Sequence, residues 1–157
     1  MRIGYGYDAH RFVHHRPLVI GGIVIPYSYG LLGHSDADVL THAMMDALLG
    51  ALALGSIGDH FPDTDPAYKD ASSTDLLVEV MGLVHKKGYG VGNIDSVLVA
   101  EMPKFFSYIV AIRENLACVM QIDIDRVSVK ATTTEKMGFE GRQEGISAHA
   151  VVLLERK

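Results

Sequence analysis

The sequence lacks several features that would place it outside the ordinary globular proteins. It has no tryptophan and one cysteine, Cys118, which excludes a disulfide within the chain and fits a reducing compartment. The apolar neighbours of Cys118 predict a buried side chain rather than a nucleophile. No run of about 18 apolar residues occurs, and residues 1–6 lack the apolar stretch of a signal peptide. We therefore expect no membrane span, and a cytoplasmic protein or one in an organelle lumen after removal of a transit peptide.

Runs of lysine and arginine are also missing. The formal net charge of −5 disfavours nucleic acid as a partner, although a local basic pocket for phosphates is still allowed. The composition is 48% hydrophobic and 21% charged, which is typical of a globular protein. The length of 157 residues predicts a single domain over residues 1–157.

Polar residues recur inside the most apolar part of the chain. Residues 35–54 predict a buried helix with Ser35 as its N-cap. Asp38, His42 and Asp46 follow at steps of four and therefore share one stripe of that helix. Burying this stripe without partners would cost free energy, so we expect other groups to satisfy it.

The best candidate partners are two polar residues near the N-terminus. Asp8 and His10 are two positions apart in a predicted strand and face the same way. Together with His42 they would form a three-ligand zinc site with one open position. Asp38 or Asp46 would then orient a ligand imidazole from behind. The spacing also allows a simpler interpretation, in which His42 is a buried histidine bonded to a helix aspartate.

The remaining pattern predicts strands and helices in an order typical of the α+β class. We expect one mixed β-sheet with helices packed on one face. The predicted strands are residues 1–12, 18–26 (one strand, kinked at its glycines), 93–101, 126–132 and 146–154. The other predicted helices are 72–87 and 105–120, and the predicted loops are 56–66 and 133–145.

Several segments are suited to binding phosphates. His34 and Ser35 stand at a helix entrance, which is either an anion site or a plain cap. The run 130–136 holds three threonines and Glu135, which would serve phosphates and Mg²⁺ or simply form a β-edge. Lys104 and Arg142 are further candidate phosphate contacts. The acidic loop 61–65 either receives substrate hydroxyls or makes Asx-turns. Together these features favour phosphoryl transfer.

The same segments resemble a known family, the 2-C-methyl-D-erythritol 2,4-cyclodiphosphate synthases of the non-mevalonate isoprenoid pathway. The likeness runs from Met1 to the final strand, and its blocks are specific in kind and in order. They are Gly4-Tyr5-Gly6-Tyr7-Asp8-Ala9-His10, His34-Ser35-Asp36-Ala37-Asp38, His42, Asp46-Ala47-Leu48-Leu49-Gly50, Phe61-Pro62-Asp63-Thr64-Asp65-Pro66, Pro103-Lys104 and Lys130-Ala131-Thr132-Thr133-Thr134-Glu135-Lys136.

The resemblance implies a small α+β fold in a homotrimer, with the sheets of three subunits facing each other and three active sites between subunits. It implies a phosphorus–oxygen lyase acting on 4-diphosphocytidyl-2-C-methyl-D-erythritol 2-phosphate. The 2-phosphate attacks the β-phosphorus, and the cyclic diphosphate and CMP are the products. The chain has no room for the cytidylyltransferase domain fused to some relatives, so only the cyclising step is expected.

The resemblance also implies a role for individual residues. Asp8, His10 and His42 would bind Zn²⁺, and Glu135 would hold a Mg²⁺ or Mn²⁺ that bridges the substrate phosphates. His34 and Thr133 would be catalytic. The substrate-binding residues would be Ala9, Ser35, Ser56, Ile57, Gly58, Phe61, Pro62, Asp63, Thr64, Asp65, Ala100, Glu101, Met102, Pro103, Lys104, Phe105, Phe106, Thr132, Thr134, Phe139 and Arg142. Of these, Ala100–Phe106 and Thr132 would hold the cytidine diphosphate part from the neighbouring subunit.

A cavity on the three-fold axis is implied as well, where an isoprenoid diphosphate would bind. Tyr7, Phe139, Arg142 and Glu144 would line it. Two residues depart from the family pattern. Ser56 stands where an aspartate commonly contacts the ribose hydroxyls, so we expect a weaker or water-mediated contact. Tyr7 stands where phenylalanine is common, which makes this cavity less apolar.

Two rival functions stay open at this stage. A zinc hydrolase would use Asp8, His10 and His42 to activate water, and would release inorganic phosphate or a linear product. A non-catalytic trimeric module would bind isoprenoid or nucleotide diphosphates around a purely structural zinc. A closed metal site with four protein ligands would favour this second rival.

Overall fold

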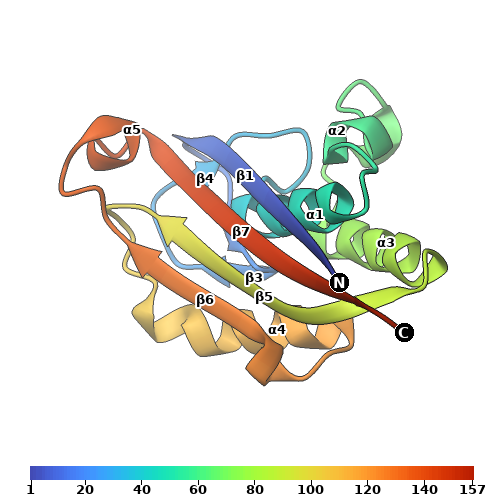
Figure 1. Ribbon diagram of the computed structural model, residues 1–157. Helices are drawn as coiled ribbons and strands as arrows, with labels where there is room; N and C mark the ends of the chain where they lie inside the picture. The colour runs from blue at the N-terminus through green and yellow to red at the C-terminus, as the bar shows by residue number, and fades with distance from the viewer.

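A five-stranded mixed sheet forms the centre of the molecule (Figure 1), and the computed structural model describes all 157 residues. The strand order is β4-β1-β7-β5-β6. Only β5 and β6 pair in parallel; the other neighbours are antiparallel. This confirms the predicted mixed sheet. The strands are β1 (Arg2–Val13), β4 (Gly30–Leu31), β5 (Tyr89–Val99), β6 (Val127–Thr132) and β7 (Gly145–Arg156).

Three helices cover one face of this sheet. They are α1 (Val39–Ala51), α3 (Ser73–Lys86) and α4 (Ile109–Met120). The covered side of β7 is fully apolar, since Ile146, Ala148 and Val152 are completely buried there. The opposite face of the sheet has no helical cover. It exposes large apolar side chains, namely Ile3, Tyr5, Tyr7 and Val151.

Helix α1 lies directly on β1, and two glycines make this possible. A Cβ atom at Gly4 would collide with the carbonyl oxygen of Ala47, and one at Gly6 with that of Ala43. The glycines therefore allow the backbones of helix and strand to approach each other closely. This close approach fixes α1 against the strand that carries Asp8.

The prediction of one kinked strand over 18–26 was wrong. The segment forms a hairpin of β2 (Leu18–Ile20) and β3 (Ile23–Ile25), separate from the main sheet. Gly21 and Gly22 both have positive φ, 57° and 75°, as a tight two-residue hairpin turn requires.

The bounds of α1 also differ from the prediction. The helix begins at Val39 with Asp38 as its N-cap, because Ala37 has a φ of 57° that no right-handed helix accepts. Ser35 therefore lies in the preceding loop, where its hydroxyl accepts the Ala37 N–H. At the other end, Ala53 has a φ of 56° and ends the predicted continuation to Leu54.

Smaller differences lie in the loops and at the ends of elements. The loops 56–66 and 133–145 contain short helices, and β5 begins four residues earlier than predicted. Cys118 is exposed on α4, so its predicted burial was wrong. None of the helices combines the length and the apolar character of a membrane-spanning helix. The short helices are α2 (Ile57–His60), η1 (Pro66–Tyr68), η2 (Phe106–Tyr108), η3 (Ile124–Arg126) and α5 (Gly138–Gly141).

Candidate active site

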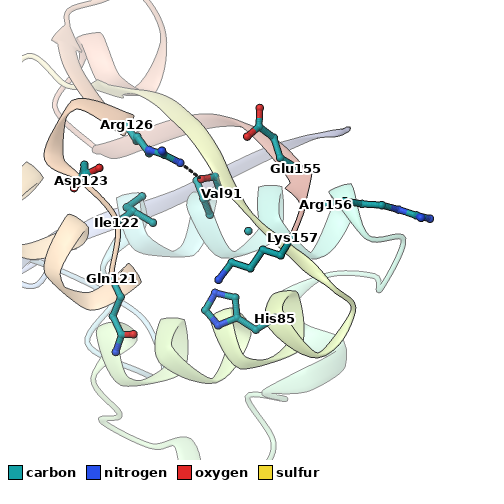
Figure 2. Close-up of a pocket in the computed structure, with 10 residues that line it drawn as sticks. His85, Val91, Gln121, Ile122, Asp123, Arg126, Glu155, Arg156 and Lys157 are labelled. Atoms are coloured by element: carbon teal, nitrogen blue, oxygen red, sulfur yellow. Dashed lines mark hydrogen bonds between the residues drawn. The ribbon is translucent and has the colours of Figure 1, made fainter.

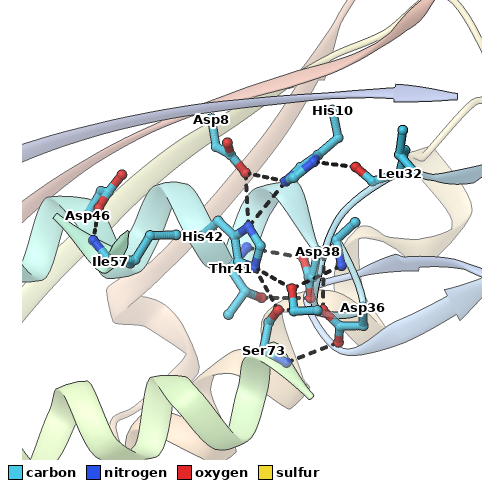
Figure 3. Close-up of polar contacts among 12 residues, drawn as sticks. Asp8, His10, Leu32, Asp36, Asp38, Thr41, His42, Asp46, Ile57 and Ser73 are labelled. Carbon is cyan, nitrogen blue, oxygen red and sulfur yellow. Dashed lines mark hydrogen bonds and ion pairs between the residues drawn. The ribbon is translucent and has the colours of Figure 1, made fainter. Parts of the chain in front are cut away.

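Asp8, His10 and His42 meet at one point between β1 and α1 (Figure 3). Asp8 Oδ2 lies 2.8 Å from His10 Nε2 and 3.0 Å from His42 Nδ1. The two ring nitrogens are 3.2 Å apart. In a tetrahedral zinc site, ligand atoms about 2.0–2.1 Å from the ion are roughly 3.3–3.4 Å from one another. The three side chains thus already form a triangle of nearly the size that a divalent cation needs.

Each imidazole uses its other nitrogen for a hydrogen bond. His10 Nδ1 donates to the carbonyl oxygen of Leu32 at 2.8 Å, which leaves Nε2 free to face Asp8. His42 Nε2 lies 2.8 Å from the hydroxyl of Ser73 and 3.1 Å from that of Ser35. Residue spacing did not reveal Ser73, because it belongs to a different helix from His42.

The structure corrects the expectation that Asp38 or Asp46 orients a ligand imidazole. Both oxygens of Asp38 are used by other donors, namely the N–H groups of Gly21 and Gly22 and the N–H and hydroxyl of Thr41. Asp46 accepts the N–H of Ile57 at 2.7 Å and so joins α2 to α1. Burial raises the pKa of both carboxyl groups.

The electrostatics of the triad favour a positive charge at its centre. Burial would raise the pKa of Asp8, but hydrogen bonds from His10 and His42 outweigh it and lower the pKa to about 2. Burial would likewise lower the pKa of His10, yet the bond to Asp8 and its negative charge raise it. The carboxylate therefore stays ionised and attracts either a proton on His10 or a metal ion. Two imidazoles and one carboxylate are a ligand set suited to Zn²⁺.

A cavity of about 520 Å³ opens beside the triad. His34 lies on its wall and donates from Nε2 to the carbonyl oxygen of Asp65 at 3.1 Å. Arg16, which the sequence did not single out, binds the carbonyl oxygens of Gly33 and Ser35 and holds this loop in place. The predicted substrate residues that line the same cavity are Ser35, Ile57, Gly58, Phe61, Pro62 and Asp63.

Three predicted residues near this cavity do not line it. Ser56 precedes α2, and its N–H and hydroxyl both donate to the carboxylate of Asp59. These bonds lower the pKa of Asp59. Asp65 accepts the N–H of Ala67 and starts η1. Thr64 is exposed between them. The hydroxyl of Ser56 thus already donates its hydrogen to a residue of α2.

A second cavity of about 670 Å³ lies where β5 and β6 end. Ala100, Pro103, Lys104, Phe105, Phe106, Thr132 and Thr133 of the predicted set line it. Strands β1 and β6 are three positions apart in the sheet, which separates them by about 14 Å. Within one chain, the predicted cytidine-binding residues and Thr133 are therefore not brought to the triad.

The other residues predicted around this second cavity lie beside it. Glu101 accepts the N–H of Lys136 at 3.0 Å, and Met102 is exposed. The hydroxyl of Thr134 donates to the carbonyl oxygen of Met137. Glu135 is exposed after β6 and does not belong to the triad of Asp8, His10 and His42.

The residues predicted for an axial cavity are only partly together in one chain. Phe139 and Glu144 line a small cavity of about 180 Å³, together with Ala9 from the predicted substrate-binding set. Arg142 forms an exposed ion pair with Glu144 at 2.8 Å. Tyr7 lies on the open face of the sheet, with its ring 4.9 Å from that of His149.

A further cavity of about 500 Å³ lies at the opposite end of the sheet (Figure 2). The start of β5 and the end of β7 form part of its wall, with Gly90, Glu155 and Lys157 among the lining residues. None of the predicted site residues lies there, so the candidate chemistry is confined to the other end.

Comparison with known proteins decides the family. A model described as the YgbB family matches residues 1–155. The chain belongs to this family. Among curated YgbB relatives, the 2-C-methyl-D-erythritol 2,4-cyclodiphosphate synthase of Geotalea uraniireducens (strain Rf4) is 60% identical over 157 residues and is covered, like this chain, over 100% of its length. The synthase of Desulfitobacterium hafniense (strain DSM 10664 / DCB-2) is 59% identical over 154 residues, 98% of both chains.

Solved structures agree with the YgbB assignment. A 2C-methyl-D-erythritol-2,4-cyclodiphosphate synthase with CDP bound has a TM-score of 0.90 and 40% identity, covering 98% of this chain and 100% of that one. The bifunctional IspDF of Campylobacter jejuni reaches a TM-score of 0.96 at 42% identity; the match covers 99% of this chain but 42% of that one.

Proposed function

We propose that this chain is an enzyme that cyclises 4-diphosphocytidyl-2-C-methyl-D-erythritol 2-phosphate. The products are 2-C-methyl-D-erythritol 2,4-cyclodiphosphate and CMP. The observation that carries the proposal is the triangle of Asp8, His10 and His42, open to a cavity that also holds His34 and Asp63. Relatives named for this synthase are 60% identical over the full chain.

In the proposed reaction one phosphorus–oxygen bond forms and one breaks. An oxygen of the 2-phosphate attacks the β-phosphorus, and the bridging oxygen leaves with CMP. His34 and Thr133 stabilise the charge that grows on the phosphoryl oxygens, and Ser35 adds a hydroxyl beside His34. Asp63, exposed on the cavity wall, accepts hydrogen bonds from hydroxyl groups of the methylerythritol part.

The proposed site also has ligands for metal ions. Asp8, His10 and His42 would hold Zn²⁺, and Glu135 would hold Mg²⁺ or Mn²⁺ with the substrate phosphates. A bound divalent ion acts as a Lewis acid, polarising the diphosphate oxygens and offsetting their charge. The chain's own part is to keep the three ligand atoms converged, which the bonds to Leu32, Ser35 and Ser73 do before any ion binds.

We further propose a homotrimer with active sites between subunits. Two observations support it. The uncovered sheet face exposes Ile3, Tyr5, Tyr7 and Val151, a set that a monomer would leave in water. The triad and the second cavity, which Lys104 lines, lie near different edges of the sheet. A neighbouring subunit is therefore needed to bring Lys104 to the triad. A head-to-tail ring of three places such surfaces together. An isoprenoid diphosphate would bind on the ring axis.

Product analysis tests the reaction. The purified protein is incubated with the cytidyl substrate, Zn²⁺ and Mg²⁺, and the products are followed by ³¹P NMR. We expect CMP and a cyclic diphosphate in equal amounts. Inorganic phosphate or a linear diphosphate instead would point to a hydrolase. No CMP release would refute the proposal.

Subunit mixing tests the shared site. His42→Ala and Lys104→Ala are each expected to lower turnover strongly. Random trimers made by co-expressing the two contain sites in which both residues are intact, about one quarter of the total. Recovery of roughly this fraction of wild-type activity is expected, and no recovery would place both residues in the same subunit's site.

A further inference from the structure

A line of polar contacts runs from the buried His42 through the buried Ser73 to a half-buried carboxylate (Figure 3). His42 Nε2 lies 2.8 Å from Ser73 Oγ, and the Ser73 hydroxyl donates to Asp36 Oδ1. The second oxygen of Asp36 accepts the Ser73 backbone N–H at 3.0 Å. Ser73, the first residue of α3, is completely buried, so water does not compete for its hydroxyl.

The direction of these hydrogen bonds follows from the donors available. A carboxylate has no hydrogen to give, so the hydrogen between Ser73 and Asp36 comes from the serine. The hydroxyl oxygen then offers only lone pairs to His42. Nε2 must therefore carry the hydrogen and donate it, which leaves the lone pair of Nδ1 pointing at Asp8 and His10.

Ser35 does not impose the same direction. Its hydroxyl lies 3.1 Å from His42 Nε2 and accepts the N–H of Ala37 at 3.2 Å. No carboxylate bonds to it, so its hydrogen is free to turn either way. Of the two serines at His42, only Ser73 has an acceptor that fixes its hydroxyl.

We propose that Ser73 and Asp36 are positioning residues, which act in series to hold His42 with its Nδ1 lone pair directed at the cation site. This inference rests on the metal site proposed above. Asp36 orients the hydroxyl, and the hydroxyl orients the ring. Neither residue belongs to the triad or lines the cavity beside it, and neither contacts His10, whose ring is held separately by Leu32.

We call this series of contacts, from Asp36 through Ser73 to His42, the relay. It is tested by measuring the zinc affinity of the metal-free protein in competition with a chromophoric chelator. Ser73→Ala is expected to weaken zinc binding by about tenfold to a hundredfold, the usual effect of losing a partner behind a metal-bound histidine. Asp36→Asn, which leaves one acceptor oxygen where the carboxylate has two, weakens it in the same direction. Because the two act in series, the double variant should bind no more weakly than Ser73→Ala alone.

Ser72→Ala is the matched control. Ser72 is adjacent in sequence, but its hydroxyl bonds to Thr74 rather than to His42. Its zinc affinity should stay within about twofold of wild type. The visible spectrum of bound Co²⁺ gives a second readout, which should change in Ser73→Ala and not in Ser72→Ala.

The outcomes separate the relay from the metal site itself. Equal zinc affinity and equal Co²⁺ spectra in Ser73→Ala and Ser72→Ala would overturn the relay while leaving the metal site intact. Additive losses in the double variant would also overturn it. A wild-type protein that binds no zinc would overturn the metal proposal and this inference together. If circular dichroism shows that Ser73→Ala is unfolded, the zinc affinity of Asp36→Asn becomes the test. Wild-type zinc affinity in Asp36→Asn would refute the relay, and weakened affinity would support it.

Discussion

His10 Nε2 and His42 Nδ1 face each other at 3.2 Å, although one ring belongs to a strand and the other to a helix. Asp8 lies within 3.0 Å of both. Two imidazole nitrogens at this separation need a proton or a cation between them, because two lone pairs face to face repel. The closeness of these atoms is therefore the most informative feature of the site.

Removing one of these nitrogens should empty the site. We expect His42→Ala to lose bound zinc, from about one ion per chain to almost none, because two remaining ligands hold zinc poorly. The fold should persist, since the change leaves the apolar core intact. Metal content measured by atomic emission, with circular dichroism for folding, checks this.

His34→Ala is the control for that experiment. His34 lies in the same cavity but bonds to Asp65 and not to the triad, so its loss should leave zinc in place. Zinc retained in His42→Ala, or lost equally in both variants, would contradict the ligand assignment.

Between about pH 6 and 8, the stability of the metal-free protein should fall as pH rises, whereas that of the zinc-loaded protein should rise. The pKa of Asp8, lowered from 3.8 to about 2, gives stability that is present above 3.8 and lost as pH falls toward 2. The raised pKa of His10 gives stability that is present below 6.5 and lost as pH rises through the raised value. Protons on His10 also compete with zinc. The difference in Tm between loaded and metal-free protein should therefore widen between about pH 6 and 8. A constant difference would count against His10 as a ligand.

Gly6 should tolerate no side chain. A Cβ there meets the carbonyl oxygen of Ala43, so Gly6→Ala must push α1 away from β1. We expect a loss of about 3 kcal/mol in the free energy of unfolding, measured with urea. Gly82→Ala is the control, because a Cβ at Gly82 in α3 meets nothing within 4 Å. It should stabilise the protein by roughly 0.5–1 kcal/mol, as alanine is the better helix former. Equal effects at both positions would rule out the close approach as the cause.

Lys104 should bind the diphosphate of the nucleotide and leave the metal alone. Its exposed ammonium group borders the cavity at the ends of β5 and β6. Lys104→Ala is expected to weaken CDP binding about tenfold in calorimetry, with zinc content unchanged. Lys86→Ala, an exposed lysine at the end of α3, should bind CDP like wild type. Unaltered CDP affinity in Lys104→Ala would remove this residue from the site.

The sequence predicted those parts of the site that depend on local periodicity. Asp8 and His10 share a face because strands alternate, and His42 lies on the most apolar helix. Their convergence on one point was inferred from the cost of burying polar groups without partners, and the structure confirms it. The hairpin at Gly21-Gly22 was also predictable, since two glycines between two short apolar runs are a typical hairpin turn.

Other parts depend on tertiary contacts that no spacing reveals. The four-residue spacing predicts that Asp38 and His42 share one stripe of a helix. In the structure Ala37 has a left-handed conformation, so α1 begins only after Asp38, which caps the helix. Ser73 bonds to His42 from another helix, 31 positions away. Cys118 has apolar neighbours in sequence, yet α4 turns it toward water. In each case the deciding partner lies outside the local segment.

The carboxylate of Asp38 gives the β2–β3 hairpin an influence that its own residues would not suggest. It holds the turn at Gly21 and Gly22 with the same two oxygens that start α1. One helical turn later comes His42. A loosened hairpin would therefore rotate the start of α1 and move the His42 imidazole away from Asp8 and His10. Damage to this distant turn would then weaken metal binding before it affected the rest of the fold.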